Sequence, residues 1–161
     1  MTQDFLTAPE WEIAQWFNAE QPLSVAALRG KVIVLHAFQM LCPACVQTAI
    51  PQAQRIHRQF DPNEVATIGL HTVFEHHQVM TPAALEVYIH ENRLTFPIAV
   101  DRADGQSSVP LTMRTYGMQG TPTLILIDRR GRLRLHHFGN VEDMVIGAAI
   151  ATLVAENADA A

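Results

Sequence analysis

The chain has 161 residues, of which 48% are hydrophobic and 17% are charged, and its formal net charge is −5 at pH 7. A chain of this length and composition is expected to fold as one globular domain that buries about two thirds of the surface exposed when unfolded. The acidic balance, with no basic run, gives no indication of binding to nucleic acid or to an anionic membrane.

The chain begins Met1-Thr2-Gln3-Asp4-Phe5-Leu6, without a positively charged segment followed by an apolar one. No later stretch approaches the ~20 apolar residues that a membrane span needs. We therefore expect a cytoplasmic location, or a periplasmic one if a signal preceded this sequence. Two cysteines are too few for the disulfide framework of a small secreted protein.

Apolar runs and helical spacings alternate along the chain. Residues 32–38 are almost continuously apolar, as expected for a strand buried on both faces. After Cys42 the apolar residues recur at spacings typical of a helix, which Pro51 should kink because proline lacks a backbone N–H. Thr81 and Pro82 supply a capping residue and a first-position proline for a second helix.

The same alternation continues to the C-terminus. Asp128-Arg129-Arg130-Gly131 is expected to be a hairpin turn in which glycine takes a positive φ. The pattern predicts an α/β fold whose sheet has an antiparallel edge. The expected strands are residues 32–38, 65–70, 97–100, 123–127 and 133–138, and the expected helices follow Cys42, run over 82–93, end at Tyr116 and run over 141–156.

The only two cysteines, Cys42 and Cys45, stand where the first buried strand passes into a helix. Cys42 is then expected at the helix N-terminus, where unpaired N–H groups and the helix dipole stabilise a thiolate. Pro43 suits the first helical position. Cys45 should lie one turn further on and be more buried. This order predicts that Cys42 attacks a disulfide and that Cys45 resolves the mixed disulfide.

Other motifs accompany the cysteine pair: Leu28-Arg29-Gly30-Lys31, Ile50-Pro51, Tyr116-Gly117-Met118-Gln119-Gly120-Thr121-Pro122-Thr123 and Leu126-Ile127-Asp128-Arg129-Arg130-Gly131. Together they resemble thioredoxin-fold proteins of the redoxin and TlpA-like thiol–disulfide oxidoreductase family. The resemblance implies a single thioredoxin-like domain over residues 1–161, with a central mixed sheet flanked by helices. Its core would be about residues 22–156, with residues 1–21 as an N-terminal extension packed on the core and 157–161 as a frayed tail.

The resemblance also implies that the bond between Thr121 and Pro122 is cis and faces the cysteines. Leu41, in place of the tryptophan common in this family, should make the surface beside Cys42 more aliphatic. His36 stands where many thioredoxins have a buried acid that helps to deprotonate the resolving cysteine. An imidazole there could transfer the same proton near neutral pH, or it could be a hydrogen-bonded core histidine.

Two histidine pairs lie farther along the chain. Glu75-His76-His77 follows a strand that should end on the same edge as the cysteines, where it could tune them, contact substrate or bind a metal; a solvated loop is the preferred interpretation. His136-His137 lies on a late strand farther from that edge and is assigned no role.

Three functions fit the cysteine pair. The preferred one is a thiol–disulfide oxidoreductase that acts on protein or small-molecule disulfides. No flavin or nicotinamide motif is present, so we expect no cofactor and a reductant that is a thioredoxin-type protein or glutathione. The second function is a copper(I) carrier using the two thiolates and a histidine. The third, a dedicated peroxidase, is disfavoured because Gln39 stands where redoxin-type peroxidases carry threonine or serine.

Overall fold

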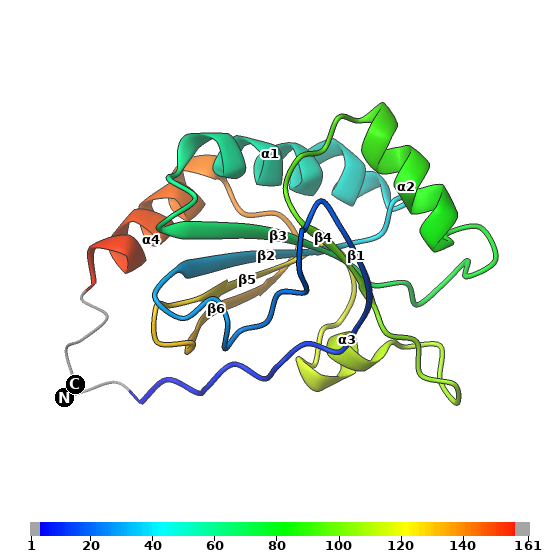
Figure 1. Cartoon of the computed structure of the whole chain (residues 1–161), viewed down its shortest axis with the longest axis horizontal. Helices are drawn as coiled ribbons and strands as arrows, with labels where there is room; N and C mark the ends of the chain where they lie inside the picture. The colour runs from blue at the N-terminus through cyan, green and yellow to red at the C-terminus, as the bar shows by residue number, and fades with distance from the viewer. Residues whose placement is uncertain (1–3, 157–161) are drawn as a thin grey trace.

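A mixed six-stranded sheet with helices on both faces makes up the computed structural model, which describes residues 4–156 (Figure 1). The expected tail at 157–161 lies outside the described residues. The strand order is β1-β4-β3-β2-β5-β6. Strands β2, β3 and β4 are parallel to one another, and the remaining pairs are antiparallel. The strands are β1 (Ile13–Phe17), β2 (Val32–Phe38), β3 (Val65–His71), β4 (Ile98–Asp101), β5 (Thr123–Ile127) and β6 (Leu133–Phe138).

Helices α1, α2 and α4 cover one face of the sheet, and α3 with the N-terminal segment covers the other (Figure 1). The predicted α/β order is confirmed, and β2, β5 and β6 have the expected bounds. No helix within residues 4–156 is long and apolar enough to cross a membrane. The helices are a π-helical turn η1 (Cys45–Ala49), α1 (Ile50–Gln59), α2 (Pro82–Glu91), α3 (Leu111–Thr115) and α4 (Asp143–Ala155).

The helix around Pro51 is not α-helical throughout: helical backbone from Pro43 passes through the π-helical turn η1 before α1 begins. The kink at Pro51 stays a prediction. The N–H of Ile50 reaches back to the carbonyl of Cys45, and Pro51 follows in the first turn of α1. The wider turn accommodates a residue that donates no hydrogen bond and crowds the turn before it.

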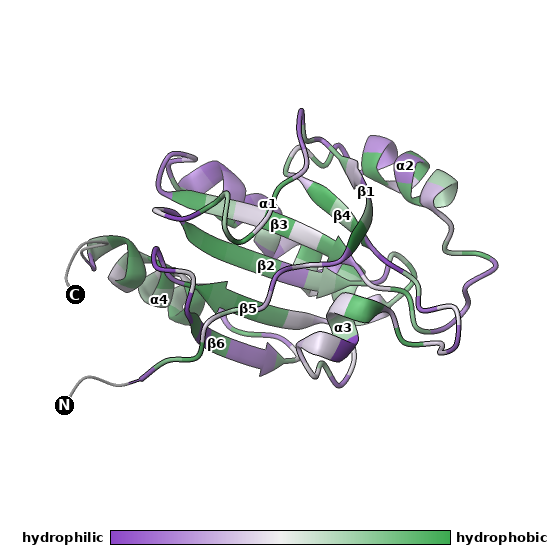
Figure 2. Ribbon diagram, turned by 60° about the horizontal axis from the view of Figure 1, so that its bottom comes forward, coloured by the Kyte–Doolittle hydropathy of each residue, from purple (hydrophilic) through white to green (hydrophobic). Residues whose placement is uncertain are grey.

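The N-terminal residues do not only pack on the core; they also add a strand to the sheet. Residues 13–17 form the edge strand β1, which pairs antiparallel with β4 and has a bulge between Ile13 and Gln15. No β1 side chain is fully buried, so the strand lacks the apolar run that marks a central strand. The opposite edge, β6, is also only partly buried and is hydrophilic over much of its length (Figure 2).

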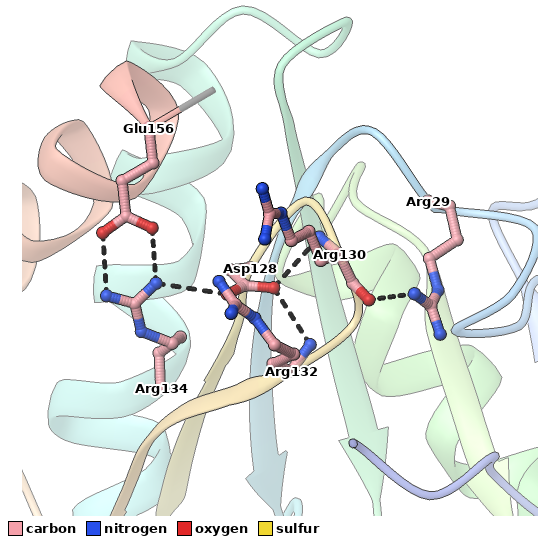
Figure 3. A network of polar contacts seen from close by, with 6 residues as sticks. All are labelled: Arg29, Asp128, Arg130, Arg132, Arg134 and Glu156. Atoms are coloured by element: carbon pink, nitrogen blue, oxygen red, sulfur yellow. Dashed lines mark hydrogen bonds and ion pairs between the residues drawn. The ribbon is translucent and has the colours of Figure 1, made fainter. Parts of the chain in front are cut away.

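A network of arginine and carboxylate side chains lies at the end of the sheet opposite Cys42 (Figure 3). Asp128 is 3% exposed and accepts hydrogen bonds from the side chains of Arg132 and Arg134 at 2.8 and 3.1 Å. Arg134 also pairs with Glu156 at the end of α4. Burial raises the pKa of the Asp128 carboxyl, but hydrogen bonds from these arginines and from two backbone N–H groups outweigh burial, so the net shift is downward.

We predict that Asp128→Asn lowers the free energy of unfolding by about 2 to 3 kcal/mol at pH 7, because it leaves two arginines without their buried anion. Since folding lowers the pKa of Asp128, its stabilising contribution is present at neutral pH and is lost as the pH falls through that lowered value. Urea denaturation at pH 7 and pH 3 measures both effects. Asp4→Asn, at an exposed position, is the matched control. An unchanged stability of Asp128→Asn at pH 7 would contradict this account.

Candidate active site

Cys42 occupies the N-cap of the helix that follows β2. Its own N–H donates to the carbonyl of Gln39 at 3.0 Å, and helical backbone starts at Pro43. Its sulfur accepts a hydrogen bond from the N–H of Cys45, with an N–S distance of 3.3 Å. A side chain that accepts from the third helical N–H satisfies one of the unpaired donors of the first turn. A thiolate at this sulfur would accept the same bond more strongly.

The two cysteines differ in access to solvent. Both are free thiols; Cys42 is half-buried, whereas Cys45 is 0% exposed. Burial, with a smaller effect of the adjacent Cys42, raises the pKa of the Cys45 thiol to about 12. Hydrogen bonding from the Gln39 backbone and from the Thr121 hydroxyl acts in the opposite direction. The accessible sulfur is therefore Cys42, and the Cys45 sulfur is closed to solvent.

Thr121 and Pro122 lie beside Cys42, just before β5. Their peptide bond is cis. The Cys42 thiol donates to the Thr121 carbonyl, with an S–O distance of 3.6 Å. Leu41, directly before Cys42, is 52% exposed. The residues that the sequence singled out around the cysteine pair are thus brought together, with an aliphatic side chain at the rim.

His36 faces α1, and one of its two ring nitrogens makes a hydrogen bond there. Its Nε2 lies 3.2 Å from Oε1 of Gln52. The amide nitrogen of Gln52 donates to the Val141 carbonyl and to Asp143, so Oε1 is the acceptor and His36 Nε2 carries the hydrogen. The buried Nδ1 has no hydrogen-bond partner within residues 4–156. Burial, opposed in part by Gln52, lowers the pKa of His36 to about 4.

The His36 ring hydrogen-bonds to α1 rather than to a cysteine. Among the described residues, no hydrogen bond joins its ring to Cys42 or Cys45, and Gln52 lies seven residues beyond Cys45, roughly 10 Å along the helix. The imidazole is neutral at pH 7 and belongs to the packing between β2 and α1. A proton-transfer role stays a prediction.

The other histidines that the sequence offered as candidates also lack a hydrogen bond to the cysteines among the described residues. His76 and His77 are exposed on the loop after β3, and His136 bonds to the Tyr116 carbonyl at 2.9 Å. Within residues 4–156, no group of three or more His, Cys, Asp or Glu side chains is arranged to hold a metal.

Two residues that contact the site were given no part in it from the sequence. His71, at the end of β3, accepts the Met40 N–H at 3.1 Å and so orients the segment before Cys42. Gln39 is 1% exposed and contacts two other loops of the site. For Gln39 the available signal was a polar side chain directly after the almost continuously apolar run at residues 32–38.

We predict that iodoacetamide at pH 7 modifies Cys42 at least about a hundredfold faster than Cys45 in the reduced protein, because Cys45 is buried and its raised pKa leaves almost no thiolate. Peptide mass spectrometry of time points gives both rates. In urea the two rates should converge. Equal rates in the folded protein would overturn the assignment of the accessible sulfur.

A second prediction concerns acid stability. Because folding lowers the pKa of His36 from 6.5 to about 4, its neutral ring contributes stability above pH 6.5 that is lost as the pH falls towards 4. The loss should be about 3 kcal/mol. His36→Leu should therefore lose less stability than the wild type between pH 7 and pH 4 in urea denaturation. The control is His90→Leu, at an exposed position; identical pH dependence of His36→Leu and wild type would contradict the assignment.

Two solved structures have a fold similar to that of this chain. The crystal structure of the thioredoxin-like superfamily protein SPOA0173 is 53% identical, with a TM-score of 0.92 over 94% of this chain and 98% of that one. A thiol-disulfide isomerase from Corynebacterium glutamicum is 49% identical, with a TM-score of 0.90 over 93% of this chain and 97% of that one. The sheet and helices described above are therefore a thioredoxin-like fold.

Curated relatives are more distant. Sporulation thiol-disulfide oxidoreductase A of Bacillus subtilis is 27% identical over 69% of this chain and 61% of its own length. Protein DipZ of Mycobacterium tuberculosis is 29% identical over 83% of this chain, which spans only 18% of DipZ. Residues 6–136 match the AhpC/TSA family. The cysteine pair at a helix N-terminus, the thioredoxin-like fold and this match over most of the chain establish that the protein belongs to the AhpC/TSA family.

Proposed function

We propose that the protein is a thiol–disulfide oxidoreductase in which Cys42 attacks and Cys45 resolves. The Cys42 thiolate attacks one sulfur of a substrate disulfide, and the other substrate sulfur leaves as a thiolate. The Cys45 thiolate then attacks Cys42, the mixed disulfide breaks, and the second substrate sulfur leaves. The substrate disulfide gains two electrons, and the protein dithiol becomes an internal disulfide.

The observation that carries this proposal is the contact between the two cysteines. The sulfur of Cys42 is accessible and accepts the N–H of Cys45, while the buried Cys45 lies one helical turn behind it. This spacing keeps the two cysteines on adjacent turns of one helix, where the second can act on a disulfide formed by the first. The relatives named as thiol-disulfide oxidoreductase and thiol-disulfide isomerase support the same chemistry.

The supporting residues have separate parts in the proposal. Pro43 starts the helix at a position where no N–H is needed. Thr121 and Pro122 form the wall beside Cys42, where the Thr121 backbone can receive an extended substrate segment. The proposal includes His36 only as a proton acceptor. Its ring is neutral, and its Nδ1 has no hydrogen-bond partner within residues 4–156.

The substrates, reductant and compartment are also part of the proposal. We propose protein or small-molecule disulfides as substrates and a thioredoxin-type protein or glutathione as the source of electrons. In the cytoplasm, where thiols are kept reduced, the net direction would be reduction of the substrate.

No observation favours the two alternatives. A copper(I) carrier would need a histidine near the two thiolates, and His76 and His77 are exposed on a separate loop of the described structure. A dedicated peroxidase would need a hydroxyl where Gln39 stands, and the Gln39 amide is engaged by its neighbours.

We predict that the reduced protein releases two equivalents of aromatic thiolate from 5,5′-dithiobis(2-nitrobenzoate) in two phases, the first from attack by Cys42 and the second from closure of the internal disulfide. Cys45→Ser should release one equivalent and retain a stable mixed disulfide, because no resolving thiol remains. Cys42→Ser should lose the fast first phase. Absorbance at 412 nm and intact mass follow both steps.

Two results of the thiolate-release experiment would contradict the proposal. If Cys45→Ser also released two equivalents, or if the wild type kept a stable adduct on Cys42, the second cysteine would not resolve the first.

A further inference from the structure

His71 is the last residue of β3, and its side chain contacts the segment that leads to Cys42. Strands β2 and β3 are parallel, and Phe38 and His71 are the final pair of their ladder. The Thr72 N–H still donates to the Phe38 carbonyl, at 3.1 Å. The next bond of a parallel ladder would take the Met40 N–H to a backbone carbonyl of the neighbouring chain. Here the Met40 N–H donates to Nε2 of His71 instead, at 3.1 Å, so the imidazole takes the place of a backbone acceptor where the chain leaves the sheet.

The residues after β2 form a turn that leads into the helix N-terminus. The N–H of Cys42 donates to the carbonyl of Gln39 at 3.0 Å, which closes these four residues into a β-turn. Met40 is the second residue of the turn, and its N–H takes no part in closing it. A partly buried N–H needs a partner, and this one finds it outside the turn. His71 therefore anchors the turn to the end of β3.

The contacts determine the state of the His71 ring. A backbone N–H can only donate, so Nε2 is the acceptor and the ring hydrogen is assigned to Nδ1. The residue is 1% exposed, and its ring is tilted against that of Phe38, with centroids 5.1 Å apart. Burial lowers the pKa of His71 to about 4, so the ring is neutral at pH 7. The ring is thus held in place in the state that can accept the Met40 N–H.

We propose that His71 is a positioning residue for the attacking cysteine, because it holds the turn from Gln39 to Cys42 so that the Cys42 sulfur stays at the helix N-cap. This inference rests on the proposed function and deepens it. At the N-cap the sulfur accepts the Cys45 N–H at 3.3 Å and lies beside the Thr121 carbonyl. The Cys42 thiolate bonds to one substrate sulfur, the bond between the two substrate sulfurs breaks, and the second sulfur leaves as a thiolate. His71 neither gains nor loses a proton in this step.

The other contacts of the turn do not replace this one. The Gln39 side chain anchors the turn one residue earlier, by accepting an N–H of the loop after β3 at 3.2 Å. Leu41, on the other side of Met40, is 52% exposed, so little packing restrains that side of the turn. Among the described residues, the hydrogen bond to His71 is the last side-chain anchor before Cys42.

The first experiment removes the acceptor and measures the first phase of thiolate release from the aromatic disulfide at pH 7. His71→Phe keeps a planar ring beside Phe38 but offers no acceptor, and we expect it to slow the first phase about tenfold. His71→Gln can place an amide oxygen near the position of Nε2 and should retain the first phase within about threefold. The matched control is His90→Phe, at an exposed position on α2, which should leave the first phase unchanged.

The second experiment removes the donor. Met40→Pro has no backbone N–H, and proline is favoured at the second position of a type I turn. Neither Met40 nor Leu41 has a positive φ, as that turn requires. Met40→Ala loses the same side chain but keeps the N–H, so it is the matched control. We expect the first phase of Met40→Pro to be about tenfold slower than that of Met40→Ala. In a His71→Phe background the two should have equal rates, because the N–H then has no acceptor to lose.

Amide hydrogen exchange, followed by NMR, reports the hydrogen bond itself. The Met40 amide should be protected in the wild type and in His71→Gln, and should lose its protection in His71→Phe. The amides within β2 should remain protected in all three proteins, which separates release of the turn from unfolding of the domain.

The outcomes distinguish the proposed function from the role of His71. A wild type without a fast first phase, or a fast first phase that persists in Cys42→Ser, would defeat the proposed function itself. A wild-type first phase in His71→Phe, or equal slowing in His71→Gln, would overturn the positioning role and leave the oxidoreductase intact. Equal rates for Met40→Pro and Met40→Ala, with His71 present, would also overturn it, even if His71→Phe did not fold. An unprotected Met40 amide in the wild type would have the same consequence.

Discussion

Strand β2 is buried along all seven of its residues, and the position of the site depends on this constraint. The strand hydrogen-bonds to β3 on one side and to β5 on the other, while apolar layers cover both of its faces. A strand held from four sides has little freedom to shift its register. Because β2 ends at Phe38, the residues from Gln39 to Cys42 leave the sheet at a fixed point, where the loops after β3 and before β5 also arrive.

At that point the helix N-terminus gives the two cysteines unequal environments. Cys42 caps the helix and accepts the N–H of Cys45 at 3.3 Å, whereas Cys45 is enclosed between β2, α1 and α2. Burial that protects a thiol also disfavours its thiolate. The resolving cysteine is therefore the group that depends most on its neighbours.

The sequence was sufficient to predict the parts of the structure that local pattern determines. The apolar run at residues 32–38 and the cysteine spacing placed Cys42 at a strand-to-helix junction, and Thr81-Pro82 marked a helix start that the structure has. The edge strand β1 could not be predicted in this way, because half-exposed residues carry no apolar run. Nor could the π-helical turn before Pro51, which a proline motif does not distinguish from a kink.

The contacts of Gln39 and His36 depend on residues far away in the chain. Gln39 meets Thr121 across 82 positions, and His36 meets Gln52, whose amide is held in turn by Val141 across 89 positions. A single sequence does not report which distant side chain an amide will face. For the same reason the buried-acid position that suggested a role for His36 did not indicate that its ring would bond to α1 instead.

The central claim is that Cys42 and Cys45 form one two-electron redox couple, and their reduction potential tests it most directly. The protein would be equilibrated in glutathione buffers of graded ratio, quenched with acid, and alkylated so that intact mass counts the free thiols. Our account predicts a single two-electron transition between a monomeric dithiol and a monomeric internal disulfide. A pair that never closes, or that closes only between two chains, would contradict it.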